Sequence, residues 1–372
     1  MITLIEVNSK ALFREFVTFP FRLYKNDPNW VPPLIEDELA TLDATKNPAF
    51  DQAEALFYLA QREGKTVGRI AAIINWEEVN NQKKRKVRFG WWDVIDDLSV
   101  TEALLEKVYA LGKKHDLTYV EGPIGFSNLD KVGVVTEGFD RLSSMITWYN
   151  YPYYKTHLEQ LGFVKEKEYL ENVFSFKNVE IEPYRKASAL IQKRYQLVSK
   201  NFNKTAEIMP YVDEMFDLFN KAYASLSSFV AINAKQKEYF KKKYIGLIKP
   251  EYIKFVFDNA GKLIAFGIVM PNLSEAMKKA NGKLFPFGFY HLLKAQKKHD
   301  EVLFYLIGVD PEYQNKGVTA LIFEAYYDSF QKNGVQTCVR TPELEENTAI
   351  QNIWKNFNPT VFRRRRTYKK DL

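Results

Sequence analysis

The chain of 372 residues has one cysteine, Cys338, and four histidines. A single thiol excludes an intramolecular disulfide and a cysteine-rich zinc site, and the histidines show no ligand spacing, so we expect no metal centre. No apolar run in the sequence approaches the roughly 18 to 20 residues that cross a membrane. The amino terminus also lacks the basic and apolar regions of a secretory signal. These absences predict a cytoplasmic protein without a membrane span.

Hydrophobic residues make up 46% of the chain and aromatic residues 15%, which predicts a folded protein, and the length is usual for two domains. Charge is divided unevenly. Residues 1–180 carry 22 Lys and Arg against 27 Asp and Glu, whereas residues 181–372 carry 31 against 19. A basic half suits a polyanionic ligand such as a phosphorylated cofactor, a nucleic acid or an acidic lipid surface, although a solvated face has the same composition.

Hydrophobic periodicity predicts the same order of elements twice: hairpin, strand, helix, strand, helix, strand. In the first half these elements cover residues 56–75, 86–95, 100–114, 117–123, 153–161 and 163–174. In the second half a helix over 210–226 precedes them, and they cover residues 252–270, 302–309, 318–332, 335–341, 347–357 and 360–369, with a polar insertion at 271–300. We therefore expect an α/β protein with mixed sheets, and lobes at residues 1–180 and 181–372.

The most informative segment joins the predicted strand 302–309 to the helix 318–332 and reads VDPEYQNKGVT over residues 309–319. A helix that begins directly after a strand leaves several N–H groups unpaired, and its dipole favours negative charge there. Gly317 allows a close approach of phosphate oxygens to the backbone, and Lys316 adds a positive charge. The segment therefore predicts an anion-binding loop.

With its flanking strand and amphipathic helix, this segment resembles the acyl-CoA signature of the GCN5-related N-acetyltransferase (GNAT) superfamily. The family motif is Arg or Gln, two residues, Gly, one residue, and Gly or Ala; Gln314 and Gly317 match it, and Thr319 takes the place of the last small residue. Asn347, before the next helix, resembles the start of a further family motif. The resemblance implies two tandem GNAT-like lobes, of which the second binds acetyl-CoA or another acyl-CoA through Ile307, Val309, Gln314, Asn315, Lys316, Gly317, Val318, Thr319 and Asn347.

The resemblance also implies a mechanism in which an amine attacks the thioester directly. A backbone N–H near residues 307–309 would hold the developing oxyanion, and a carboxylate or water would act as base. Many members place a tyrosine acid seven residues after the asparagine, where this chain has Trp354 on the apolar stripe of a predicted helix. We expect Trp354 to pack rather than to transfer a proton. The general acid and base stay unassigned, with Tyr326 and Tyr290 as alternatives for the acid.

The first lobe resembles a copy that has lost acyl-CoA binding. Its corresponding turn, DVIDDLSVTE at residues 93–102, has no glycine and several carboxylates. We expect Ser99 and Glu102 to form a capping box that satisfies the amides of this turn. The carboxylates would also repel a phosphate.

A long loop follows the predicted strand 117–123, and loops of this length are uncommon unless they are functional. We expect it to contact the substrate through Phe126, Ser127, Asn128, Asp130, Tyr149 and Tyr153. Packing of the aromatic residues between the lobes is an equally good interpretation. The run of arginines at residues 363–366 is interpreted as a solvated terminal strand, since alternate side chains of a strand face opposite ways.

We therefore predict an N-acyltransferase, and within this class an N-acetyltransferase, that moves an acyl group from acyl-CoA to the amine of a small molecule or peptide. One alternative is an aminoacyl-tRNA-dependent transferase of the two-lobed GNAT-like type, although the long helical hairpin usual in that class is not evident. This is the one reading in which a nucleic acid, tRNA, is a partner. The other alternative, favoured by Trp354, is a non-catalytic acyl-CoA-binding or interaction module.

Overall fold

Two series of strands and helices follow one another along the chain. The elements that periodicity predicted occur in the predicted order in both, with further helices and strands before and between them. The first series consists of β1 (Thr3–Glu6), α1 (Lys10–Leu23), α2 (Ile35–Thr41), β2 (Ala53–Arg62), β3 (Lys65–Asn75), α3 (Trp76–Asn80), β4 (Lys86–Val94), α4 (Leu98–Lys114), β5 (Tyr119–Gly122), β6 (Val134–Glu137), α5 (Tyr153–Gln160) and β7 (Val164–Ser175).

The second series consists of α6 (Glu182–Tyr195), β8 (Val198–Lys200), α7 (Thr205–Ile208), α8 (Val212–Tyr223), α9 (Ala234–Tyr244), β9 (Ile253–Phe257), β10 (Leu263–Pro271), α10 (Ser274–Ala280), α11 (Gly288–Lys297), β11 (Glu301–Val309), α12 (Thr319–Asn333), β12 (Thr337–Leu344), α13 (Thr348–Trp354) and β13 (Thr360–Asp371). The computed structural model describes residues 1–127, 129–226 and 229–372. Within these stretches no helix combines the length and the apolar character needed to cross a bilayer.

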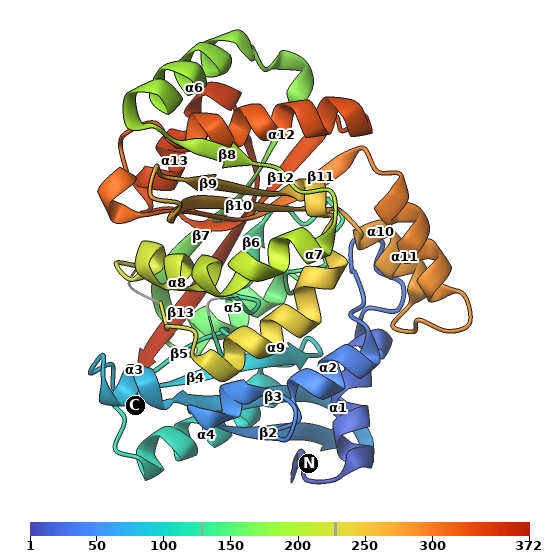
Figure 1. Cartoon of the computed structure of the whole chain (residues 1–372). Coiled ribbons are helices and arrows are strands. Elements are labelled where there is room, and N and C mark those ends of the chain that lie inside the picture. Colours follow the sequence, from blue (N-terminus) through green and yellow to red (C-terminus); the bar gives the residue numbers. More distant parts are fainter. Residues whose placement is uncertain (128, 227–228) are drawn as a thin grey trace.

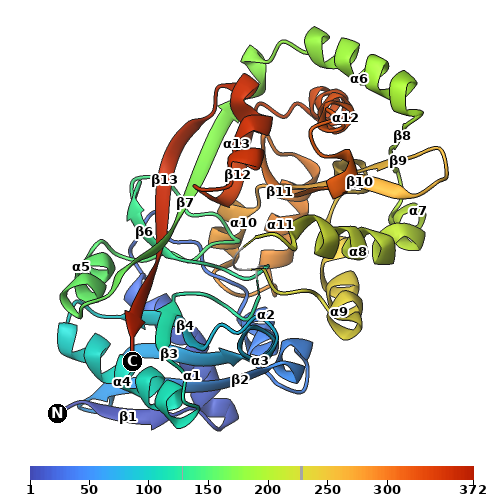
Figure 2. The same cartoon turned by 90° about the vertical axis from the view of Figure 1, so that its left-hand side faces the viewer.

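All of these strands belong to one mixed sheet that runs through both halves of the molecule (Figure 1). Its order is β1-β2-β3-β4-β5-β13-β7-β12-β11-β10-β9-β8, with β6 paired to β13. The last strand of each series therefore completes the sheet of the other: β13 lies between β5 and β7, and β7 lies between β12 and β13. Figure 2 shows β7 and β13 side by side between the halves. The sheet is continuous across residue 180, so the predicted boundary there stays a prediction.

The arginine run of β13 lies inside the molecule rather than on a solvated edge. Arg363 and Arg365 are fully buried, whereas Arg364 and Arg366 are more exposed, so the expected alternation is present but the predicted solvation is wrong for two of the four residues. The reason is that β13 pairs with β5 of the first half on one edge and with β7 on the other, so it is an interior strand. Both buried guanidinium groups face the carboxylate of Glu171 on β7, which is 1% exposed.

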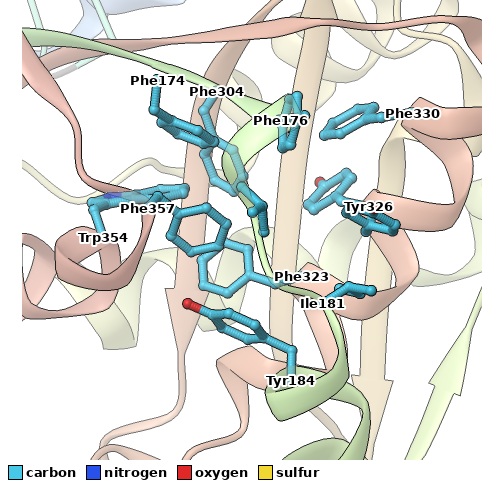
Figure 3. Close-up of a pocket in the computed structure, with 12 residues that line it drawn as sticks. Phe174, Phe176, Ile181, Tyr184, Phe304, Phe323, Tyr326, Phe330, Trp354 and Phe357 are labelled. Atoms are coloured by element: carbon cyan, nitrogen blue, oxygen red, sulfur yellow. The ribbon is translucent and has the colours of Figure 1, made fainter.

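Trp354 packs in an aromatic core of the second half, as its apolar stripe predicted. Its ring centroid lies 4.6 Å from that of Phe304 and 5.0 Å from that of Phe323. Figure 3 shows these rings around a narrow apolar cavity, with Phe174 at the end of β7 beside Trp354. The core of the second half thus includes the strand that the first half contributes.

We expect Glu171→Gln to lower the free energy of unfolding by about 3–5 kcal/mol, because two buried guanidinium groups would lose their carboxylate partner. Urea denaturation followed by circular dichroism measures this change. Glu137→Gln is the matched control, since the Glu137 side chain on β6 is 69% exposed and pairs at 3.5 Å with Arg364 of β13, the strand that carries the buried arginines. Its effect should stay within about 0.5 kcal/mol. Equal effects of the two substitutions would contradict a structural role for the buried cluster.

Candidate functional site

Strands β11 and β12 are parallel neighbours that separate part of the way along their length. Their pairing ends at Phe304 and Arg340, although β11 continues to Val309. Where the strands diverge, a cleft of about 630 Å³ opens between the second half and a loop of the first half. The separation leaves N–H groups of β11 without a strand partner on that side and available to a ligand. The carbonyls on the same side accept hydrogen bonds from the side chains of Tyr223, Gln314 and Thr341.

The turn after β11 has a backbone that only certain residues adopt. Asn315 and Gly317 have φ angles of +61° and +75°. A Cβ atom on Gly317 would lie 2.7 Å from the Cδ1 atom of Ile191 on α6. Both the left-handed conformation and this close approach require glycine at position 317.

The first turn of α12 presents unpaired donors to the cleft. Val318 is the N-cap residue and its side chain provides no capping hydrogen bond. In the part of the chain that the structure describes, the N–H groups of Gly317, Val318 and Thr319 have no acceptor. All three residues line the cleft. Consecutive free N–H groups at the start of a 15-residue helix form a favourable site for an anion.

A buried carboxylate anchors this turn to its surroundings. Asp310 is fully buried, accepts the N–H of Glu312, and faces the ammonium groups of Lys221 at 2.8 Å and Lys262 at 3.1 Å. Burial raises the pKa of Asp310, but the hydrogen bonds from Lys221, the Glu312 N–H and Lys262 outweigh it, so the pKa lies below its usual value. Asp310 therefore holds the end of β11 in place as an ionised group.

The edge of β11 supplies a further donor. The N–H of Asp310 donates to the carbonyl of Ile264 on β10, and Val309 forms the preceding pair with Ala265. Because backbone groups alternate in direction along a strand, the N–H of Val309 faces the opposite side, toward the cleft. Ile307 has the same orientation, and its carbonyl accepts the hydroxyl of Tyr223 at 3.0 Å.

The first half closes the cleft with the loop after β5. The N–H of Ser127 donates to the carboxylate of Asp130 at 2.8 Å, and both residues line the cleft. Burial raises the pKa of Asp130 above its usual value, although hydrogen bonds from Ser127 and the charges of Lys243 and Arg88 oppose the shift. On the opposite wall, burial and the nearby Asp130 raise the pKa of Tyr305. The two halves thus place a carboxyl group and a phenol in one cleft.

Arg88 of β4 holds the backbone of that loop. Its guanidinium donates to the carbonyl of Gly125 at 2.8 Å and pairs with the Glu78 carboxylate at 2.7 Å. Lys86 bridges Glu78 and Glu121. Burial raises the pKa of Glu78, but the charges of Arg88 and Lys86 outweigh it and lower the pKa to about 2. This buried network orients the part of the loop that carries Asp130.

The structure brings together most of the predicted ligand residues. All of the predicted acyl-CoA residues except Lys316 line the cleft. The Lys316 ammonium instead lies 4.7 Å from the ring centroid of Tyr313. Of the expected substrate residues, Ser127 and Asp130 line the same cleft, and Asn128 lies outside the described residues.

The remaining expected substrate residues pack within the first half. The ring centroids of Phe126 and Phe50 lie 4.9 Å apart. The hydroxyl of Tyr149 donates to the carboxylate of Asp27 at 2.6 Å. The hydroxyl of Tyr153 donates to the carbonyl of Val94 at 2.6 Å. These contacts favour the packing interpretation for the aromatic residues of the loop.

Neither tyrosine considered as the acid lines the cleft. Tyr326 is buried and donates to the carbonyl of Tyr252, and Tyr290 is exposed on α11. Tyr223 and Tyr305 line the cleft instead, together with Glu343. Sequence reasoning missed the two tyrosines because a tyrosine on the apolar stripe of a helix or within an apolar strand indicates core. Arg88 was missed as well, although a charge within a predicted interior strand was a signal of a buried ion pair.

The equivalent position of the first half is filled by side chains. β4 and β5 also diverge, after Arg88, but the N–H of Val94 at the end of β4 donates to the hydroxyl of Tyr154 at 2.9 Å. The expected capping box is wrong: the N-cap of α4 is Asp97, whose carboxylate accepts the N–H of Ser99 at 2.9 Å. Ser99 already lies within the helix, which begins at Leu98, and its hydroxyl donates to the Asp97 carboxylate at 2.6 Å instead of capping. The other oxygen of Asp97 pairs with Arg62 at 2.6 Å. These contacts use the backbone groups that the second half leaves open.

Two curated proteins align with nearly the whole chain. The first is protein YghO of Escherichia coli (strain K12), 28% identical over 371 residues, covering 98% of this chain and 94% of that protein. The second is the bacterial ceramide synthase of Caulobacter vibrioides (strain NA1000 / CB15N), 26% identical over 381 residues, covering 100% of this chain and 98% of that protein. No protein-family model matches the chain.

Solved structures share the architecture at lower identity. A tandem GNAT protein from the clavulanic acid biosynthesis pathway superposes with a TM-score of 0.59 at 12% identity, covering 100% of this chain and 98% of that one. A GCN5-related N-acetyltransferase from Sphaerobacter thermophilus gives a TM-score of 0.53 at 9% identity, covering 100% and 95%. Identities this low show similarity of fold and nothing finer.

The raised pKa of Asp130 predicts a pH-dependent stability. At pH values between 3.8, the ordinary pKa of an aspartate, and the raised pKa of Asp130 in the folded protein, the folded state binds more protons than the unfolded state. The wild type should therefore lose stability relative to Asp130→Asn as the pH rises through this range. Urea unfolding of both proteins at several pH values measures the difference, and parallel stability curves would contradict the prediction.

Proposed function

The chain has the tandem GNAT fold that its motif predicted, and on this premise we propose that it is an acyl-CoA-dependent N-acyltransferase whose site is the cleft between the halves. One observation carries the proposal: the free N–H groups of Gly317, Val318 and Thr319 and the open edge of β11 line the same cleft as a carboxyl group of the first half. An acyltransferase of this kind needs a diphosphate cradle, a thioester groove and a base in one space.

In the proposed reaction, the start of α12 holds the diphosphate of CoA and the thioester lies along β11. The amine nitrogen attacks the carbonyl carbon, its proton passes to Asp130, and the carbon–sulfur bond breaks. The thiolate sulfur then takes this proton back from Asp130 through a water molecule, which restores the carboxylate, and CoA leaves as a thiol. The N–H groups of Ile307 and Val309 face the negative charge that develops on the carbonyl oxygen. The raised pKa of Asp130 makes it a better base near neutral pH than an ordinary carboxylate.

The name of one relative favours a lipid amine as acceptor. A ceramide is the amide of a fatty acid with a long-chain amino alcohol, so a ceramide synthase acylates an amine. We include a long-chain amine within the proposed acceptor class, beside the small-molecule or peptide amines. Part of the wall of the cleft of about 630 Å³ is apolar and includes Ile124, Leu129 and Ile146. Such a wall suits an aliphatic chain.

Calorimetric titration with acetyl-CoA and with a long-chain acyl-CoA tests the proposal directly. We expect one binding site per chain, because Tyr154 and Asp97 occupy the equivalent donors of the first half. Release of free thiol on addition of a long-chain amine should follow. Binding without turnover would favour a binding module. Retention of tRNA without binding of acyl-CoA would favour an aminoacyl-tRNA-dependent transferase.

Gly317→Ala tests the diphosphate cradle. The added methyl group meets Ile191 and strains a left-handed backbone, so we expect the affinity for acyl-CoA to fall by about tenfold or more. Gly334→Ala is the matched control at the other end of α12, where φ is +70° and a Cβ atom would meet nothing within 4 Å. That variant should bind acyl-CoA as the wild type does. An equal loss of affinity in both variants would indicate that the substitutions act by destabilising α12, and would contradict a specific role of Gly317 in binding.

A further inference from the structure

The insertion between β10 and β11 carries an unusual concentration of exposed aromatic side chains. In the described part of the chain, every exposed phenylalanine lies in this insertion: Phe285 is 75% exposed, Phe287 72% and Phe289 42%. Tyr290 and Leu293 of α11 are 58% and 50% exposed. The ring centroids of Phe285 and Phe289 lie 5.6 Å apart. Exposed apolar side chains grouped in this way mark an interaction site rather than ordinary surface composition. We call the exposed side chains of residues 284–293 the aromatic tip.

The base of the insertion is firmly attached to the first half. The N–H of Ile35 on α2 donates to the carbonyl of Gly282 at 3.0 Å, and Gly282 packs directly against the ring of Phe21. At the start of α10, the hydroxyl of Ser274 accepts the N–H of Met145 at 2.9 Å. Figure 1 shows α10 and α11 projecting beside α1 and α2. The aromatic tip is therefore held in place at its base while its rings remain uncovered.

Lysines flank the aromatic tip in the sequence. Residues 271–300 contain six lysines but only two carboxylates, those of Glu275 and Asp300. Exposed lysines precede the tip at positions 279 and 283 and follow it at positions 294, 297 and 298. Exposed positive charge thus lies before and after the exposed rings along the chain. A surface that combines exposed rings with flanking lysines matches the interfacial zone of a bilayer with anionic lipids.

We propose that the aromatic tip docks on an anionic bilayer surface, with its rings in the interfacial region and its lysines against the lipid phosphates. Charge favours this occupant over a second copy of the chain. Two copies meeting at this surface would bring together the six lysines of each insertion with only Glu275 and Asp300 of each copy to neutralise them. Lipid phosphates provide the neutralising charge, and the acyl region accepts the rings.

The attachment of the insertion also relates the aromatic tip to the cleft. Met145, which donates to Ser274, is followed directly by Ile146 and Thr147, which line the cleft. A bilayer bound at the aromatic tip would thus contact an insertion that is hydrogen-bonded to a segment of the cleft wall. The inference itself does not rest on the proposed activity, because it follows from exposure and charge alone.

Co-sedimentation with vesicles, without any acyl-CoA, tests the inference. The full chain should bind vesicles of phosphatidylcholine with phosphatidylglycerol at least about tenfold more tightly than vesicles of phosphatidylcholine alone. The double variant Phe285→Ser with Phe287→Ser should lose binding by about tenfold or more. Lys294→Gln with Lys297→Gln should weaken binding to the anionic vesicles on the order of tenfold and lessen its dependence on salt.

Val164→Ser with Leu190→Ser is the matched control, since these exposed side chains are 64% and 66% accessible and lie outside the insertion. It should bind vesicles as the wild type does. Absence of vesicle binding, or equal binding by the wild type and the Phe285→Ser, Phe287→Ser variant, would overturn the inference. Light scattering after size exclusion adds a second measurement. If the phenylalanine variant converted a dimer to a monomer, the tip would instead be a surface between copies.

Discussion

The exchange of β7 and β13 is the constraint on which the rest of the structure depends. Each strand pairs along most of its length with the other and completes the sheet of the opposite half. The pairing buries Arg363 and Arg365 against Glu171. If the two halves separated, these buried charges would lose their ion pairs, so separation is energetically costly. The cleft between the halves therefore has walls whose relative position is fixed by a shared sheet, which suits a site that needs groups from both.

The two halves show how one architecture either leaves a groove open or closes it. In both halves parallel strands diverge before a helix begins. The second half leaves the first N–H groups of α12 free, and glycine at position 317 permits the turn. The first half covers the end of β4 with Tyr153 and Tyr154, and caps α4 with Asp97. The difference lies in a few side chains and not in the course of the backbone.

The half without an open groove still contributes to the site. Arg88, paired with Glu78, positions the backbone of the loop that carries Asp130, so the charged network of the first half sets one wall of the cleft of the second. The insertion with the aromatic tip is attached to the same half through Gly282 and Ser274. The first half thus acts as the framework that holds a carboxyl group and an exposed apolar surface in position.

The sequence alone determined the order of the repeated elements and the glycine-containing turn before α12, because hydrophobic period and turn chemistry are local properties that neighbouring residues specify. It also predicted that Trp354 packs. Only the tertiary structure decided that the arginines of β13 are buried, that Tyr149 and Tyr153 pack within the first half, and that Asp130 shares a cleft with Tyr305. These outcomes depend on contacts between residues far apart in the chain. A local pattern carries no information about which strand will lie beside it.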